Sequence, residues 1–513
     1  MPESPGVSLA EGVARSAAVD GSLSYDAVDA DATLLLCPRW LVTMTDRDDG
    51  AIRSRRWLED QAVVLRHGRV LDVLPTEAAV RAYGDRGSAR VLHLPHHVVM
   101  PGLINAHTHA GMSLLRGCGD DQPLHKWLAG TIWPAEHALV DEAFVRDGTL
   151  LAVAEMIRSG CTTLNDMYWF PEETVRVCLE VGMRAVIGMI HIEFASRYAD
   201  GPREYLQRGE AMLQAFADHP QVAARVYTAE ADRARPVPLV HFAYAPHAPY
   251  TVSEGALVEI VQRAARVGRR VHMHLHETAE EVRASRVLDR GSSMCHQSVH
   301  SGTPLQNLQR LRLLGPQWIA VHAVHLSDEE IRLVAETGAS VVHCPSSNLK
   351  LASGFCPVPQ LLRAGVNVAL GTDSAASNNK LDMFSEMRLA ALLGKAVADD
   401  AVAVDAATAL RMATVNGARA LALEHCLGRV APGMAADLVA VRLEGQMESA
   451  PTYDVLSSLV YAASREQVTH VWVGGRCLLR DRQLLTIDES ALLARVRYQA
   501  QRVASLLEGA PAS

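Results

Sequence analysis

The stretch PGLINAHTH, residues 101–109, ends a run of apolar residues that begins at position 98 and is typical of a buried strand. Residues two apart on a strand face the same way, so His107 and His109 are expected to point together from its carboxyl end. A His-x-His pair alone is weak evidence for a metal site, because surface and core histidines also occur at this spacing by chance. Its place at the end of an apolar strand nevertheless favours a metal site.

Seven further apolar runs follow this strand, separated by amphipathic segments. The runs cover residues 161–165, 184–192, 239–245, 270–276, 318–322, 340–344 and 366–371, and the helical segments include 143–159, 254–267 and 328–337. Eight strands with helical crossovers predict an α/β fold, a (β/α)₈ TIM-like barrel rather than an open doubly wound sheet. No G-x-G-x-x-G follows the first strand, which also weakens a dinucleotide-binding fold.

Both flanks of the barrel have the pattern of short strands. These strands are predicted at 33–37, 62–66, 69–74 and 90–94 before the barrel, and at 438–442, 468–473 and 477–479 after it, ahead of a helix at 490–507. We expect the flanks to build one small β-sandwich domain. The predicted organisation is a flexible tail (1–28), the N-terminal segment of the sandwich (29–98), the metal-dependent barrel (99–425), and the C-terminal segment of the sandwich with the last helix (426–513).

The composition narrows the class of protein. The chain has 513 residues, is 49% hydrophobic and 21% charged, and carries a formal net charge of −9. A nucleic-acid partner would need clustered Lys and Arg, and a membrane helix would need about 18 apolar residues in a row, so we expect neither. Nine cysteines without a C-x-x-C pair, and Glu3 and Glu11 in an N-terminus with no apolar run, predict a reduced, cytoplasmic protein.

Polar side chains also occur at the ends of later barrel strands. The fifth run contains His272, His274 and His276, which share one face, so spacing alone does not choose a ligand among them. The sixth run ends at His322, and the eighth leads to Asp373. An ionised carboxylate buried at a strand end needs a partner, and a metal ion supplies one.

Imidazoles and a carboxylate at one end of a barrel indicate hydrolytic metal chemistry. Such a set suits one divalent ion, Zn²⁺ with a position left for water, and Fe²⁺ also fits. The ion would bring the pKa of that water towards about 7. Asp373 can take the proton of the water, Glu277 can hold a ring nitrogen of the substrate and carry a proton, and His322 can polarise the attacked centre.

Several blocks of this sequence resemble the amidohydrolase superfamily, in its single-metal branch of nucleoside and base deaminases and triazine hydrolases. Within that branch the chain looks most like the S-adenosylhomocysteine/5′-methylthioadenosine deaminases, from about Ala32 to the last strand. The blocks are PGLINAHTHAGMSLLRG (101–117), WPAEHALVDEAFVRDGTLLAVAEMIRSG (133–160), HLHET (274–278), HCPSSNLKLASG (343–354) and GTDSAASNNKLDMFSEM (371–387).

This resemblance implies a set of site residues. The metal ligands would be His107, His109, His274 and Asp373, because the motif pairs the ligand on the fifth strand with a Glu three residues later. Glu277, His322 and Asp373 would be catalytic. The residues implied to contact substrate are Trp127, Glu136, His247, Glu277, Ser377 and Arg203, although without the resemblance Trp127 would be read as a core aromatic and Glu136 as a solvated helix residue.

The sequence is compatible with three functions. The first is an aminohydrolase acting on adenine nucleosides (S-adenosylhomocysteine, 5′-methylthioadenosine, adenosine), in which Trp127 and Glu136 read the ribose. The second is a deaminase or hydrolase of a free base or aromatic amine, such as guanine, 8-oxoguanine, a pterin or a triazine. The third, a binding module without catalysis, would leave a gap in the ligand set, and the sequence shows none.

Two departures from the family pattern bear on which base enters: Ser374 stands where many relatives have Gly, and the segment 288–309 is longer than usual. The sequence leaves open the 5′ substituent, the native metal, and whether the chain forms a homo-oligomer.

Overall fold

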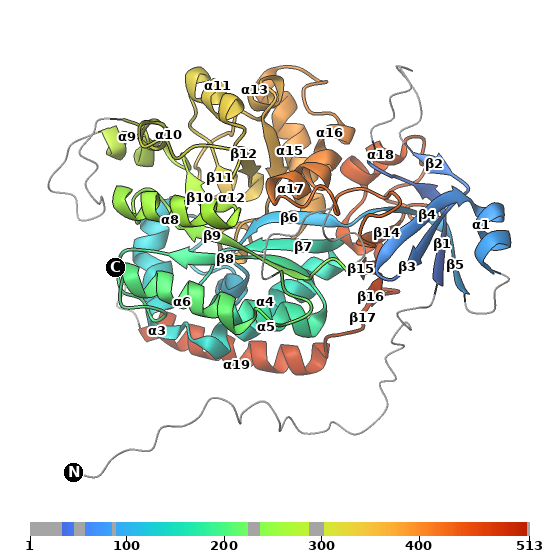
Figure 1. Cartoon of the computed structure of the whole chain (residues 1–513), viewed down its shortest axis with the longest axis horizontal. Coiled ribbons are helices and arrows are strands. Elements are labelled where there is room, and N and C mark those ends of the chain that lie inside the picture. Colours follow the sequence, from blue (N-terminus) through green and yellow to red (C-terminus); the bar gives the residue numbers. More distant parts are fainter. Residues whose placement is uncertain (1–32, 46–56, 85–88, 224–235, 287–301, 510–513) are drawn as a thin grey trace, which may run out of the picture.

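Eight parallel strands form the sheet that carries the two histidines (Figure 1). The computed structural model describes residues 33–45, 57–84, 89–223, 236–286 and 302–509; the predicted tail over 1–28 and most of the segment 288–309 lie outside these residues. Neighbouring strands pair in sequence order, which confirms the predicted barrel architecture. The strands are β6 (Leu103–Thr108), β7 (Cys161–Asp166), β8 (Arg184–His191), β9 (Val240–Pro246), β10 (Val271–Leu275), β11 (Trp318–His322), β12 (Ser340–His343) and β13 (Asn367–Leu370).

The first barrel strand starts later than the sequence predicts. Residues 98–101 belong to β5 (Ala89–Pro101), a strand of the second sheet, and the chain crosses into the barrel at Gly102. A Cβ on Gly102 would lie 2.1 Å from Thr162 Cγ2, so only glycine fits this crossing. The apolar run continues through both sheets, and hydrophobicity alone therefore does not mark the change.

Side chains and single backbone bonds join the last barrel strand to the first. Asn105 on β6 donates to Thr372 Oγ1 (2.7 Å) and accepts from the Thr372 amide (2.9 Å). The Asp373 amide then donates to the His107 carbonyl at 3.1 Å. A Cβ on Gly371 would lie 2.8–3.0 Å from His107, so this glycine permits the close approach. The seam thus brings Asp373 beside the histidine strand.

Helices surround the barrel strands, as the amphipathic segments predict (Figure 1). Those predicted at 143–159, 254–267 and 328–337 are α4 (Glu142–Arg158), α8 (Glu254–Val267) and α11 (Asp328–Thr337), and each begins after an Asp or Ser N-cap. The other helices on the barrel are α5 (Pro171–Val181), α6 (Pro202–Ala215), α9 (Ala279–Arg286), α10 (Pro304–Arg310), α12 (Pro345–Lys350), α13 (Val358–Arg363), α14 (Ala375–Asn378), α15 (Met383–Ala398), α16 (Ala406–Met412) and α17 (Val415–Ala420).

A helical insertion follows β6 before α4 begins. It comprises η2 (Ala110–Leu115), α2 (Leu124–Trp127), η3 (Leu128–Ile132) and α3 (Trp133–Leu139). Because β6 ends at the two histidines, this insertion starts at the carboxyl end of the barrel, where sites of this fold are found.

Both flanks contribute to the second sheet, as predicted. In hydrogen bonding it is one mixed sheet of nine strands, in which β5 from the first flank pairs with β14 from the second. Its strands are β1 (Thr33–Leu41), β2 (Leu58–Glu59), β3 (Gln61–Arg66), β4 (Arg69–Pro75), β5, β14 (Leu438–Arg442), β15 (Val468–Val473), β16 (Arg476–Arg480) and β17 (Gln483–Leu484). A helix that the strand pattern does not predict, α1 (Thr76–Tyr83), lies between β4 and β5. The predicted domain boundaries stay predictions.

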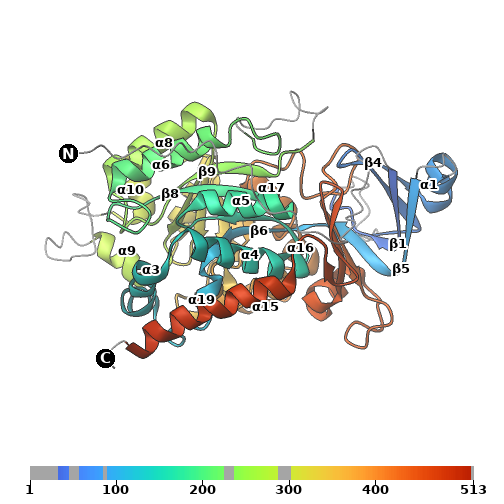
Figure 2. The same ribbon diagram turned by 90° about the horizontal axis from the view of Figure 1, so that it is seen from below.

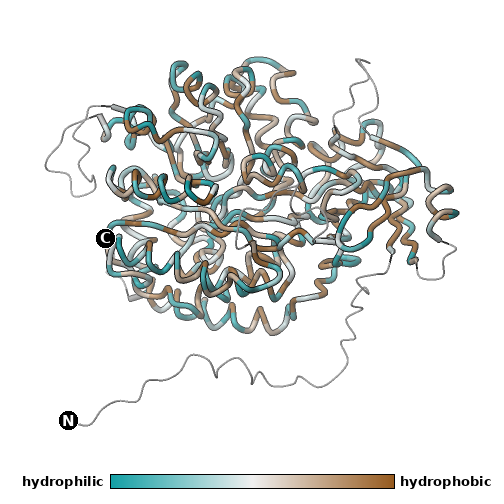
Figure 3. The backbone as a smooth tube through the Cα atoms, viewed as in Figure 1, coloured by the Kyte–Doolittle hydropathy of each residue, from teal (hydrophilic) through white to brown (hydrophobic). Residues whose placement is uncertain are grey.

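The C-terminal helix, α19 (Glu489–Gly509), runs back from the second sheet along the outside of the barrel and packs on α4 (Figure 2). The helices of the molecule carry both polar and apolar residues along their length (Figure 3). Among the described residues, none of the helices has the length and apolar character needed to span a bilayer.

Candidate metal centre and active-site cavity

Four side chains converge at the carboxyl end of the barrel: His107, His109, His274 and Asp373. His109 Nε2 and His274 Nε2 lie 3.2 Å apart, as do His274 Nε2 and His107 Nε2. Asp373 Oδ1 lies 3.3 Å from His107 Nε2 and 3.2 Å from His109 Nε2. No two of the four donor atoms are more than 4.8 Å apart. The structure therefore brings together the four ligands that the resemblance implies.

The spacing of these donors fits a divalent cation. Zinc–nitrogen bonds of about 2.0–2.1 Å in a tetrahedral site place neighbouring donors roughly 3.3 Å apart. Each histidine also directs Nε2 inward, because its Nδ1 bonds elsewhere: His107 to His272 Nε2 (2.9 Å), His109 to the Met167 carbonyl, and His274 to the His247 carbonyl (2.8 Å). Such outer bonds fix the ring tautomer that leaves Nε2 free to bind metal.

Asp373 is held so that its two oxygens face different ways. Its Oδ2 accepts hydrogen bonds from Ser347 Oγ (2.6 Å) and Ser377 Oγ (2.7 Å), which leaves Oδ1 toward the histidines. The residue lies just after β13 in a left-handed conformation, with φ of +61°. A strained backbone that aims a functional group is common at active sites.

The three histidines of β10 and its end have separate surroundings. His272, fully buried, bonds to His107 and supports the ligand instead of joining the donor set. His276 donates from Nδ1 to the His325 carbonyl (2.8 Å), while its Nε2 accepts from the Leu305 amide (3.1 Å). Only His274 reaches the donor cluster, which removes the ambiguity that the sequence spacing left.

Glu277 and His322 face each other beside the donor cluster. The Glu277 Oε2 atom lies 3.8 Å from His322 Nε2, and both side chains are buried. Burial, together with the charge of Asp373, raises the pKa of Glu277 to about 8, so its carboxyl carries a proton at neutral pH. His322 Nδ1 pairs with Asn348 Oδ1 at 2.8 Å, and burial lowers the pKa of His322.

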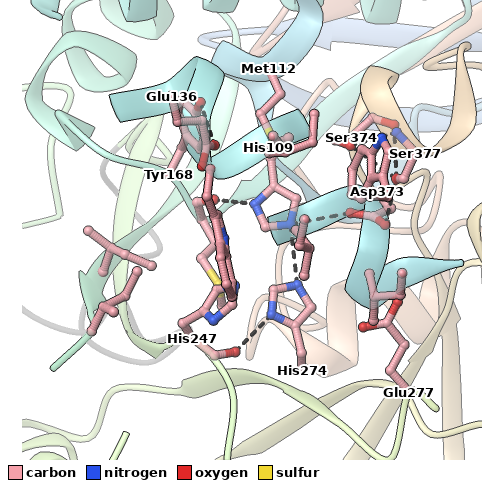
Figure 4. Close-up of a pocket in the computed structure, with 18 of the residues that line it drawn as sticks. His109, Met112, Glu136, Tyr168, His247, His274, Glu277, Asp373, Ser374 and Ser377 are labelled. Carbon is pink, nitrogen blue, oxygen red and sulfur yellow. Dashed lines mark hydrogen bonds and ion pairs between the residues drawn. The ribbon is translucent and has the colours of Figure 1, made fainter. Parts of the chain in front are cut away.

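A cavity opens over these groups (Figure 4). Three of the four metal donors line it, His109, His274 and Asp373, together with Glu277 and His322. The partly exposed residues Leu124, Leu128, Trp133 and Phe194 also line it, so an apolar rim leads to the polar interior.

Glu136 brings a third carboxyl into this cavity, in addition to those of Glu277 and Asp373. It lies on α3, is 5% exposed, and accepts a hydrogen bond from Tyr168 Oη at 2.8 Å (Figure 4). Burial raises the pKa of Glu136 to about 7, and the bond from Tyr168 acts in the opposite direction. At neutral pH this carboxyl is therefore close to half ionised.

Among the other residues implied to contact substrate, the structure brings Trp127, His247 and Ser377 to the cavity wall. Trp127 donates its indole N–H to the Cys118 carbonyl (3.0 Å). Arg203 differs: it is exposed near the start of α6 and lies outside the set of residues that line the cavity.

Several residues of the site are not identified by the sequence analysis. They are Ser347, which bonds to Asp373; Asn348, which orients His322; Tyr168, which bonds to Glu136; and the rim residues Trp133 and Phe194. Ser347 and Asn348 belong to the quoted block 343–354, so a polar pair directly after a barrel strand was the available signal. Tyr168 and Phe194 carried no such signal.

Comparisons with known proteins identify a matching family and similar relatives. Residues 98–478 match the amidohydrolase family. The chain is 40% identical over 452 residues to a 5-methylthioadenosine/S-adenosylhomocysteine deaminase from Teredinibacter turnerae, covering 88% of this chain and 95% of the relative. A protein of the same name from Saccharophagus degradans is 40% identical over 476 residues, covering 92% and 98%.

Solved structures share the overall fold of this chain. An adenosine deaminase from Xanthomonas campestris with bound zinc superposes with a TM-score of 0.81 and 44% identity, covering 92% of this chain and 98% of that one. A triazine hydrolase from Arthrobacter aurescens, at 21% identity and a TM-score of 0.77, covers 92% and 100% and shares the fold.

Proposed function

The chain belongs to the amidohydrolase family, and on that premise we propose that it is a metal-dependent hydrolytic deaminase of adenine nucleosides. Its substrates would be S-adenosylhomocysteine, 5′-methylthioadenosine and adenosine, and its products the inosine analogues and ammonia. One observation carries the proposal: a single cavity is lined both by three of the four metal donors and by a further carboxyl, Glu136, on helix α3 of the insertion after β6. The names of its relatives support the same reaction.

We propose one Zn²⁺ as the resident ion, held by His107, His109, His274 and Asp373, with Fe²⁺ as the alternative. When bound, the ion acts as a Lewis acid that makes water acidic enough to react near neutral pH. Asp373 takes a proton from the attacking water and passes it to the departing amino group. Its bonds from Ser347 and Ser377 hold the carboxylate in place during both transfers.

Glu277 supplies the acid. Protonated at neutral pH, its carboxyl gives a proton to N1 of the purine while the oxygen of water bonds to C6. The bond between C6 and the amino nitrogen then breaks, and ammonia leaves with the proton that Asp373 carried. The second proton of the water, still on the C6 oxygen, returns to Glu277 and restores its protonated carboxyl. His322, whose Nδ1 is occupied by Asn348, presents Nε2 to the same space, orients the attacking water and polarises the attacked centre.

The outer half of the cavity would hold the sugar. Ionised Glu136 accepts hydrogen bonds from the ribose hydroxyls, and Tyr168 keeps it oriented. Trp127 provides an aromatic wall, while His247 and Ser377 contact the base end. Arg203 as a contact to the substrate tail stays a prediction, which an exposed position does not support.

The rim favours an apolar 5′ substituent. Trp133 and Phe194 form an edge-to-face pair with ring centroids 6.0 Å apart, and Leu128 lies on the same cavity wall. A thioether placed between these side chains buries apolar surface, which a 5′-hydroxyl does not. We therefore expect 5′-methylthioadenosine to be turned over more efficiently than adenosine.

The competing function is deamination or hydrolysis of a free base or aromatic amine. Such substrates lack a ribose, so Glu136 would have no partner in them. Substituting Glu136→Gln separates the two: KM for nucleosides should rise strongly while KM for free bases stays unchanged. Equal effects on both substrate types would refute the assignment of Glu136 to the ribose.

We also propose that the enzyme acts in the cytoplasm on free nucleosides and not on nucleic acid. The eight cysteines in the described residues are free, as expected in a reducing compartment. A homo-oligomer stays a prediction, which sedimentation of the purified protein would test.

A further inference from the structure

The turn between His274 and Glu277 is held from outside the metal centre. Strand β10 ends at Leu275, and the next residue, His276, has a left-handed backbone with φ of +54°. Histidine in this region is strained, and such a conformation persists only where the surroundings enforce it. The backbone turn that presents Glu277 therefore requires stabilising contacts.

Glu281 supplies two of these contacts. Its Oε1 accepts from the His276 amide at 2.8 Å, and its Oε2 accepts from the Glu277 amide at 2.8 Å. Glu281 lies in the first turn of α9, where its own amide bonds to Thr278 Oγ1 (3.1 Å). One carboxyl group thus accepts from two successive backbone N–H groups. Burial raises the pKa of Glu281 to about 7, and these two bonds act in the opposite direction.

The Glu277 side chain has few contacts of its own. Its carboxyl has no hydrogen-bond partner among the described residues, and His322 Nε2 lies 3.8 Å from its Oε2. Where the Glu277 carboxyl points is consequently decided by its backbone. That backbone is in turn held by Glu281.

We propose that Glu281 is a positioning residue for Glu277, whose backbone it holds in the turn that aims the Glu277 carboxyl into the cavity. The inference rests on the proposed deaminase function, in which Glu277 carries the proton. Glu281 is neither a metal donor nor one of the residues that line the cavity, and its carboxyl bonds to the backbone amides of His276 and Glu277. Its charge also acts on His322, whose pKa it tends to raise.

A double-mutant cycle tests this route. We expect Glu281→Ala to lower kcat for 5′-methylthioadenosine at least 100-fold, with KM changed less than threefold and one metal ion retained per chain. In a Glu277→Gln background the same substitution should lower kcat less than threefold, because the group it positions is already removed. Glu280→Ala, an exposed neighbour on the same helix turn, is the matched control and should leave kcat unchanged. Equal losses in both backgrounds would overturn the proposal.

Glu281→Gln covers the case in which the alanine variant does not fold. It keeps one oxygen acceptor but sets an amide N–H against the second backbone donor, so we expect an intermediate loss of kcat. A kcat equal to that of the unmodified enzyme would contradict the role of the paired bonds.

A second readout does not depend on the substrate. Infrared difference spectroscopy follows the protonated carboxyl of Glu277, identified by its disappearance in Glu277→Gln. In the Glu281→Gln variant, the carboxyl of Glu277 should leave its buried position. The titration midpoint of Glu277 should then fall toward that of an exposed Glu. An unchanged midpoint would refute the positioning role, whereas a failure of the unmodified enzyme to deaminate nucleosides would refute the proposed function instead.

Discussion

Replacing Tyr168 by Phe should shift the pH dependence of nucleoside binding without affecting the chemical step. The substitution keeps the ring and removes the hydroxyl that donates to Glu136 at 2.8 Å. A hydrogen bond to a charged group contributes about 1.5–3 kcal/mol, which corresponds to a change of about one to two in pKa. The pKa of Glu136, now about 7 because of its burial, should rise to about 8–9.

The direction of the pH effect follows from the ionisation state of Glu136 that binds the nucleoside. Ionised Glu136 accepts from the ribose hydroxyls, so binding is lost as the pH falls through its pKa. At pH 7.5 about three quarters of the carboxyl is ionised in the unmodified enzyme, and about 3–24% would be ionised after Tyr168→Phe. We therefore expect kcat/KM for 5′-methylthioadenosine to fall about 3- to 25-fold at pH 7.5, with kcat at saturation unchanged.

The assay is ammonia release at steady state between pH 5.5 and 10. Tyr205→Phe is a suitable control, because this buried tyrosine donates to Ser196 and not to Glu136. With 2′,3′-dideoxyadenosine, which lacks both hydroxyls, Tyr168→Phe should have no effect. This role of Glu136 would be refuted if the fall of kcat/KM at low pH kept the same midpoint after Tyr168→Phe. It would also be refuted if that midpoint shifted equally with the dideoxy substrate.

Three further predictions concern the metal, the rim and the seam of the barrel. Asp373→Asn should abolish turnover, to below about 1% of the original kcat, even where metal analysis shows the ion retained; normal deamination would remove Asp373 from the mechanism. Phe194→Ala should reduce the preference for 5′-methylthioadenosine over adenosine about three- to tenfold, through lost apolar burial, whereas Phe355→Ala, an exposed phenylalanine outside the cavity, should leave the ratio unchanged. Gly371→Ala should weaken metal binding at least tenfold in a chelator titration, since its Cβ would lie 2.8–3.0 Å from His107; unaltered affinity would show that the seam tolerates the methyl group.

The barrel could be predicted because its strands are buried on both faces. Runs such as those that became β8 and β11 are apolar almost throughout, and helices between them begin at recognisable Asp and Ser caps. The start of β6 could not be predicted, because residues 98–101 are equally apolar and pair with β14 in the other sheet. Sheet membership depends on a partner more than 300 residues away.

The site, like the fold, is only partly predictable from the sequence. Histidines at alternate positions on a strand, and Asp373 after the last strand, mark the metal centre in the sequence. The choice of His274 over His272 depends on contacts between β6 and β10, which spacing does not contain. The pairing of Tyr168 with Glu136 likewise joins separate segments, and only the folded chain brings them within 2.8 Å.

The most direct test of the central claim is ammonia release at pH 7.5 by the zinc-loaded protein from a panel of substrates. The panel would contain 5′-methylthioadenosine, S-adenosylhomocysteine, adenosine, adenine, guanine and a triazine. We expect turnover of the nucleosides, loss of turnover after chelation with recovery on adding zinc, and little reaction with the free bases. Turnover of bases or triazines alone would contradict the assignment of adenine nucleosides as substrates.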